Sequence, residues 1–215
     1  MIELLLHADE QLALWATEYG FIVYGILFLI IFAETGLVVT PFLPGDSLLF
    51  AAGALAATGA LRLDLLLSVM AIAAIVGNVV NYAVGRQVAH RFFDEGHPPT
   101  RMDRFVKREY VRKAHDFFMK HGGKAVVLAR FVPIVRTFLP FVAGGAQMPY
   151  RSFMAYNVTG CVLWVGICTG AGYLFGNIPV VKENFELVVL GIIGVSVLPI
   201  VYEVARSLAK REASA

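Results

Sequence analysis

The chain has few charged residues, and its N-terminal part lacks one sign of charge. Charged residues make up 16% of the 215 residues, whereas soluble domains average roughly 25%. The first 61 residues contain six acidic residues but no lysine or arginine. Hydrophobic residues reach 58%, and the mean hydropathy is +0.71. This balance excludes an ordinary soluble domain and a basic surface for nucleic acid, and it indicates a membrane protein.

Motifs of hydrolytic enzymes and metal sites are also missing. There is no HExxH, no GxSxG and no histidine within the long apolar segments. Cys161 and Cys168 are seven positions apart, so they share a helix face but lie too far apart to form a disulfide, and we expect them to pack. We therefore expect no enzyme, metal or cofactor. A membrane lipid phosphatase is disfavoured, and a scaffold would leave the buried charges described below unexplained.

Apolar segments organise the chain as a single predicted domain over residues 1–215. Residues 2–18 predict a weakly amphipathic helix that lies on the membrane surface or packs against the bundle. Two apolar segments, about 37–61 and 125–148, contain prolines, which remove a backbone donor and disfavour helix at the preceding residue. We expect the second segment to be broken at both Pro133 and Pro140. These two segments favour re-entrant hairpins. Four others are long enough to span a bilayer: 20–39, 63–85, 153–175 and 187–205.

Basic residues concentrate in one loop. Residues 86–124 hold ten of the 18 lysines and arginines, so the positive-inside rule places this loop in the cytoplasm, together with the basic C-terminal tail. Within the loop, residues 101–121 predict an amphipathic helix that rests on anionic headgroups.

The two proline-containing segments also resemble each other. Pro41 and Gly53 are twelve positions apart, as are Pro133 and Gly145. With the basic loop inside, the first hairpin opens to the outside and the second to the inside. This arrangement predicts an inverted repeat, with a site where the two broken helices meet.

Four ionisable residues lie in or beside these segments: Glu34, Asp46, Arg130 and Arg136. A charge in hydrocarbon costs roughly 3 kcal/mol on insertion scales, so these residues predict a functional polar centre. Guanidinium groups bind phosphate through two parallel hydrogen bonds, which predicts that the two arginines bind an anion. Burial favours a neutral carboxyl while arginines favour a charged one, so the two acids are candidates for proton coupling.

Each of these residues also has a plain structural alternative. An arginine near the membrane edge can snorkel to a headgroup. Glu34 can lie at the water boundary, and Asp46 can cap the helix that follows the Pro-Gly-Asp turn. For Asn78 and Asn81 in the segment over 63–85, interhelical hydrogen bonding is as plausible as ligand contact. The residues that we predict to support the site are Pro44, Gly45, Asn78, Asn81, Pro133 and Pro140.

Two glycine pairs have the spacing of tight helix packing. Gly166 with Gly170, and Gly172 with Gly176, are each four positions apart. This spacing predicts close contacts within the chain or in a homo-oligomer.

Three motifs in a fixed order carry a family resemblance. They are E-x6-P-x2-PGD at residues 34–46, GNVVNYAVGR at 77–86 and RFVPIVRTFLPFVAG at 130–144. On these motifs the chain resembles the DedA family of small bacterial membrane proteins, within the SNARE-associated or VTT domain superfamily. The same domain occurs in eukaryotic lipid scramblases linked to autophagy. The resemblance covers nearly the whole chain.

The resemblance implies an all-α integral membrane protein, a multi-pass bundle with two oppositely oriented re-entrant helical hairpins. It implies proton-dependent transport and lipid flipping in the bacterial inner membrane, notably the recycling of undecaprenyl phosphate. The essential residues of the family map onto the four charged positions. We therefore expect a proton-coupled flippase whose partners are an anionic lipid, protons and membrane lipids. The alternatives are a proton-coupled small-solute transporter and a phospholipid flippase or scramblase.

Overall fold

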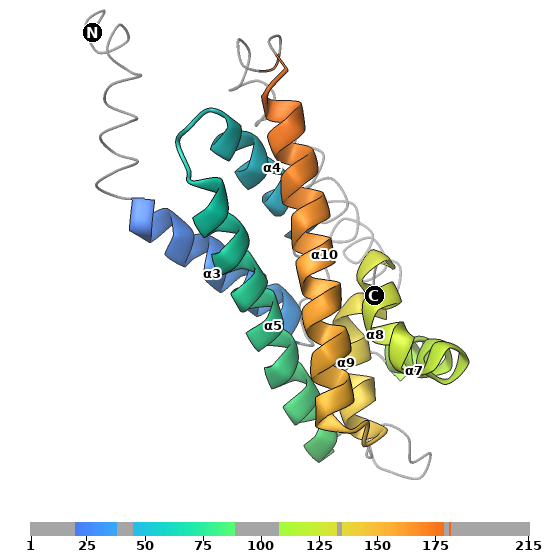
Figure 1. The fold of residues 1–215 in the computed structure, drawn as a ribbon. Coiled ribbons are helices and arrows are strands. Elements are labelled where there is room, and N and C mark those ends of the chain that lie inside the picture. The colour runs from blue at the N-terminus through green and yellow to red at the C-terminus, as the bar shows by residue number, and fades with distance from the viewer. Residues whose placement is uncertain (1–19, 38–44, 89–107, 133–134, 179–180, 182–215) are drawn as a thin grey trace, which may run out of the picture. The chain divides into compact units, whose positions relative to one another are not determined.

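The computed structural model describes residues 20–37, 45–88, 108–132, 135–178 and 181. Every regular element in these ranges is a helix (Figure 1), as predicted. Among the described residues, two helices are long and apolar enough to cross a membrane: α5 (Leu63–Val88) and α10 (Tyr150–Gly176). Two shorter apolar helices are α3 (Gly20–Gly36) and α4 (Gly45–Ala57). These elements agree with the predicted helical membrane protein.

Part of the predicted topology lies outside the described residues. This applies to the helix over 2–18, to residues 89–107 of the basic loop and to the span over 187–205. It also applies to Pro44 and Pro133. The re-entrant hairpins, the inverted repeat and the orientation in the membrane therefore stay predictions.

The helices belong to two compact units that interleave along the sequence. One unit comprises Met1–Ile22, Phe42–Leu66 and Cys168–Ala215, and the other comprises Val23–Pro41 and Leu67–Ile167. The prediction of one domain over 1–215 is not tested by this division.

In the first unit, α4 packs closely on the C-terminal end of α10. A Cβ atom on Gly53 would meet the backbone of Thr169, and one on Gly172 would meet the backbone of Phe50. One on Gly176 would likewise meet the backbone of α4. Without side chains at these positions the two backbones can approach closely. The predicted tight packing of the second glycine pair is therefore confirmed.

In the second unit, glycines bring α5 against α9 (Val135–Gly145). A Cβ atom on Gly85 would meet the backbone of Phe141, and one on Gly144 would meet the carbonyl oxygen of Tyr82. The core beside this crossing contains fully buried phenylalanine side chains, including Phe138 and Phe141. The contact fixes α9, which carries part of the site described below.

Gly85→Ala is expected to destabilise the second unit by about 1–3 kcal/mol, because its methyl group would force two backbones apart. Thermal unfolding of the purified protein in detergent measures this change. Gly25→Ala in α3 is the matched control, since nothing lies within 4 Å of a Cβ atom there. Alanine is favoured over glycine in a helix by about 1 kcal/mol, so the control is expected to melt at or above the wild-type temperature. Equal melting of both variants would contradict the close crossing.

The helix of the basic loop, α7 (Arg108–His121), packs on protein in its described part. Val111 and Ala114 are buried on the face toward α9, and the rings of Tyr110 and Phe138 lie 5.6 Å apart. This face of α7 therefore contacts protein, and the contact of the helix with lipid headgroups stays a prediction. An apolar stripe suits a protein core and a membrane surface equally, so its periodicity did not distinguish them.

The second proline-containing segment is broken at one place rather than two. It runs through η2 (Gly122–Lys124), α8 (Ala125–Leu128) and η3 (Ala129–Phe131) before α9 begins. Val132 is extended (φ −114°, ψ 109°), as expected for a residue before proline. The predicted break at Pro140 is wrong, because Pro140 lies buried inside α9. It removes one backbone hydrogen bond near the helix start, and the buried packing around it maintains the helix.

Candidate functional site

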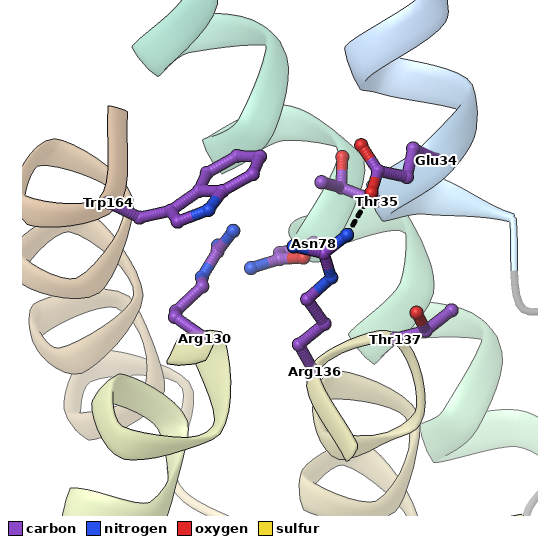
Figure 2. Close-up of a pocket in the computed structure, with 7 residues that line it drawn as sticks. All are labelled: Glu34, Thr35, Asn78, Arg130, Arg136, Thr137 and Trp164. Carbon is purple, nitrogen blue, oxygen red and sulfur yellow. Dashed lines mark hydrogen bonds and ion pairs between the residues drawn. The ribbon is translucent and has the colours of Figure 1, made fainter. Parts of the chain in front are cut away.

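The break before α9 brings the two arginines to the same place. Arg130 lies in η3, and Arg136 lies in the first turn of α9. The extended Val132 between them stays hydrogen-bonded to both sides: its N–H donates to Ala129 O at 3.0 Å, and its carbonyl accepts from Arg136 N at 3.1 Å. Figure 2 shows both guanidinium groups extending from adjacent ribbons toward one pocket. The backbone break therefore unites side chains that six positions separate in the sequence.

The pocket collects polar side chains from five helical elements of the second unit. Its cavity volume is about 10 Å³, which is the space of roughly one water molecule. A phosphate group is larger than this, so the described conformation is closed around its own side chains. The pocket is lined by Glu34, Thr35, Asn78, Arg130, Arg136, Thr137 and Trp164 (Figure 2).

A buried ion pair crosses the pocket. Arg136 Nη2 donates to Glu34 Oε1 at 2.6 Å, and the Arg136 and Glu34 side chains are 16% and 3% exposed. The pair connects α9 to α3. Removing one partner of a buried pair leaves an uncompensated charge, which costs about 3–5 kcal/mol. Glu34 is therefore not at a water boundary in this structure, and its role in proton coupling stays a prediction.

Arg130 has different partners. It is buried, and its Nη2 donates to Asn157 Oδ1 at 3.2 Å and contacts Cys161 Sγ. Both acceptors are uncharged. Among the residues that the structure describes, no carboxylate lies within ion-pair distance of Arg130. The structural alternative, in which this arginine snorkels to a headgroup, does not agree with its burial in this conformation.

Trp164 connects the two arginines. The Cζ atoms of Arg130 and Arg136 lie 5.5 Å and 5.6 Å from the centre of its ring. Guanidinium groups within about 6 Å of an aromatic face are attracted by its negative potential. The indole ring therefore lies beside both positive charges of the pocket.

The two predicted asparagines of α5 both form hydrogen bonds between helices. Asn78 Nδ2 donates to Asn157 Oδ1 at 2.6 Å, and Asn78 also lines the pocket. Asn81 Nδ2 donates to Thr35 O at 3.1 Å and to Thr137 O at 2.8 Å. Asn81 thereby connects α3 to α9 beside the ion pair. Both residues support the site structurally, which is one of the two roles that the sequence left open.

Asp46 and Gly45 begin α4 in the first unit, with Gly45 buried and Asp46 exposed. An acidic side chain in the first turn of a helix is stabilised by the free N–H groups there. This position is consistent with a local, helix-stabilising role, although Asp46 lies inside the first turn rather than before it. The structure describes the two units separately, so the role of Asp46 in the arginine site stays a prediction.

Some site residues were not predicted from the sequence. Thr35 and Thr137 are small polar residues that are common in apolar helices, so they carry little signal. Asn157 is fully buried in an apolar span, and the cost of burying an amide without partners was an available signal. Cys161 was expected only to pack, yet its thiol contacts Arg130.

Comparison with known proteins identifies the family. The VTT domain model matches residues 43–174. Protein DedA of Escherichia coli (strain K12) is 54% identical over 208 residues, which cover 96% of this chain and 93% of that protein. Inner membrane protein YqjA of the same strain is 33% identical over 207 residues, which cover 91% and 90% of the two chains.

A mycobacterial relative extends the comparison. The membrane protein Rv0364 of Mycobacterium tuberculosis (strain ATCC 25618 / H37Rv) is 41% identical over 184 residues, which cover 85% of this chain and 78% of that protein. No solved structure matches this chain significantly. The domain match and these near-complete relatives agree with the motifs and with the apolar helices. The chain therefore belongs to the DedA family of VTT-domain membrane proteins.

Proposed function

We propose that this protein is a proton-coupled transporter of the bacterial inner membrane that moves an anionic lipid, such as undecaprenyl phosphate, between leaflets. One observation carries the proposal: the Glu34 carboxylate pairs with Arg136 in a buried pocket that also contains Arg130. A carboxylate and a phosphate use the same hydrogen-bond geometry on a guanidinium group. Glu34 is thus positioned to compete with a phosphate for Arg136.

Protonation of Glu34 couples the proton to the anion in this proposal. A charged Glu34 holds Arg136, and a neutral Glu34 releases it for the phosphate. When the proton leaves, the carboxylate returns to Arg136 and displaces the lipid headgroup. The proton and the anion therefore bind together and leave together, without any covalent step, so the protein acts as a transporter and not as an enzyme.

The small cavity makes opening of the pocket a part of the cycle. A volume of about 10 Å³ excludes a phosphate group, so Arg136 must leave Glu34 or the surrounding helices must separate before the headgroup enters. We propose that the two hairpins rock to expose the site to each side in turn, with the lipid tail remaining in the bilayer.

The orientation completes the proposal. The loop over residues 86–124 and the C-terminus lie in the cytoplasm, as their basic residues indicate. Asp46 takes part in proton coupling at the mouth of the first hairpin. The names of the relatives support a membrane location, since two of those described are called membrane or inner membrane proteins.

Transport in liposomes tests the function directly. Purified full-length protein is expected to move a prenyl phosphate across the bilayer at a rate that increases with an imposed proton gradient. Phosphatidic acid is the anionic lipid with a different tail, and phosphatidylcholine is the control without net charge. A preference for the prenyl phosphate over phosphatidic acid supports the carrier-lipid proposal, because both headgroups are phosphate monoesters.

Two outcomes contradict it. Equal movement of all three lipids, independent of the gradient, indicates a scramblase. Exchange of protons for a water-soluble organic anion, with no lipid moved, indicates a small-solute transporter instead.

A further inference from the structure

Asn157 connects three elements at the back of the pocket. Its Oδ1 accepts hydrogen bonds from Asn78 Nδ2 on α5 at 2.6 Å and from Arg130 Nη2 on η3 at 3.2 Å. Its own Nδ2 donates to Ile75 O at 3.2 Å. The side chain is fully buried in α10. One carboxamide therefore determines how α5, α10 and η3 meet around Arg130.

These bonds also determine which way the carboxamide points. A flipped amide would place its NH₂ group against the donors of Asn78 and Arg130, and its oxygen against the carbonyl of Ile75. Buried donors facing donors lose their hydrogen bonds, which costs free energy at each contact. The network therefore presents the amide oxygen, and not its NH₂ group, to Arg130.

An amide oxygen orients a guanidinium group without cancelling its charge. Arg136 is neutralised by Glu34, whereas the hydrogen bonds of Arg130 among the described residues go to an amide oxygen and a thiol. A buried charge that lacks an ionic partner is unfavourable. An oxyanion in the pocket would supply that partner.

We propose that Asn157 is a positioning residue that holds Arg130 in the pocket with its charge available. Arg130 is then the fixed anion-binding group, and Arg136 is the group that exchanges between Glu34 and the anion. This proposal rests on the anion site of the proposed function, and it assigns different roles to two arginines that the sequence treats alike. The ligand chemistry is a phosphate group, whether free or on a lipid.

Trp164 provides a direct readout, because its ring lies beside both guanidinium groups. The chain has two tryptophans, so Trp15→Phe leaves Trp164 as the single fluorophore. Titration of the full-length protein in detergent with inorganic phosphate and with a short-chain prenyl phosphate is expected to give saturable changes in emission. Tighter binding of the prenyl phosphate identifies a lipid headgroup as the ligand, and equal affinity identifies the phosphate group alone.

Asn157→Asp tests the positioning role. The new carboxylate keeps the acceptors for Arg130 and Asn78 but pairs with the guanidinium charge. The variant loses the hydrogen bond to Ile75 O, so we expect a lower melting temperature than that of the Trp15→Phe parent. In the folded protein the apparent Kd for both probes is expected to rise roughly tenfold or more. In liposomes the KM for prenyl phosphate should rise more than the maximal rate falls. A residue with a purely structural role would change the melting temperature and leave the Kd of the folded protein unchanged.

Asn157→Ser decides the matter if the aspartate variant does not fold. Serine is small and polar, and it withdraws the acceptor from Arg130 without adding charge, so weaker binding of both probes is expected. Parental Kd values in the folded variants would overturn the proposal.

If liposomes move no lipid while Asn157→Asp still weakens phosphate binding, the transport function fails and the role of Asn157 stands. If the wild type transports lipid and Asn157→Asp keeps the wild-type KM, the transport function stands and the positioning role of Asn157 fails.

Discussion

Arg136→Lys is expected to reduce transport roughly 10- to 100-fold, because it loses about one charge-assisted hydrogen bond worth about 1.5–3 kcal/mol. Lysine keeps the positive charge but presents it as a point, whereas a guanidinium group offers a planar fork that matches two oxygens. In the described conformation that fork lies 2.6 Å from Glu34 and beside the ring of Trp164. An ammonium group would reach one oxygen at a time. Initial rates of prenyl phosphate movement in liposomes measure the loss.

Arg62→Lys is the matched control for this substitution. Arg62 also pairs with a carboxylate, Asp64, at 2.7 Å, but the two side chains are 77% and 69% exposed. Exposed pairs contribute about 0–1 kcal/mol, so we expect Arg62→Lys to transport at the wild-type rate. A comparison of the two variants at equal amounts of inserted protein separates the geometry of the buried fork from a general effect of lysine. Wild-type transport by Arg136→Lys would exclude the proposed phosphate clamp.

The charged part of the site was predictable from the sequence because charges in apolar segments are costly. Glu34, Arg130 and Arg136 each stand out against their neighbours, and the structure brings all three to one pocket. Their pairing was not predictable. The arginines are six positions apart in the sequence, and the sequence does not define the shape of the backbone between them. The structure shows that the backbone at Val132 is extended and that both arginine side chains line the same pocket.

The neutral part of the site carried weaker signals. Trp164 and Asn157 lie in a long apolar span, where a tryptophan is common at interfaces and an asparagine is common between helices. Their importance depends on contacts with residues far away in the chain, and a single sequence does not reveal such contacts. The same limit explains the error at Pro140, since local proline rules do not include the packing that maintains α9.

Glu34→Gln is expected to remove the fall in anion affinity that Glu34 causes as the pH rises, leaving only the dependence from the second ionisation of the phosphate itself, and to slow transport strongly. Glutamine has the shape of a protonated glutamate, so Arg136 loses its ionic partner at every pH. In the wild type, a low pH neutralises Glu34 and frees Arg136 for the phosphate, while a high pH restores the carboxylate and displaces it. The affinity of the wild type therefore falls as the pH rises. In the variant, Arg136 is expected to stay available to the phosphate at every pH, so the ligand is released poorly.

Two measurements test this expectation. Trp164 emission in the Trp15→Phe background gives the affinity for a short-chain prenyl phosphate as a function of pH, and liposomes give the transport rate. The charged side chains that line the pocket beside Glu34 are Arg130 and Arg136. Asp64→Asn is the control, because Asp64 is exposed and pairs with Arg62 outside the pocket, and its variant should keep the wild-type pH profile. Since Glu34 is the titratable carboxyl of this pocket, a normal pH profile in Glu34→Gln would assign the proton to another group, with Asp46 as the next candidate.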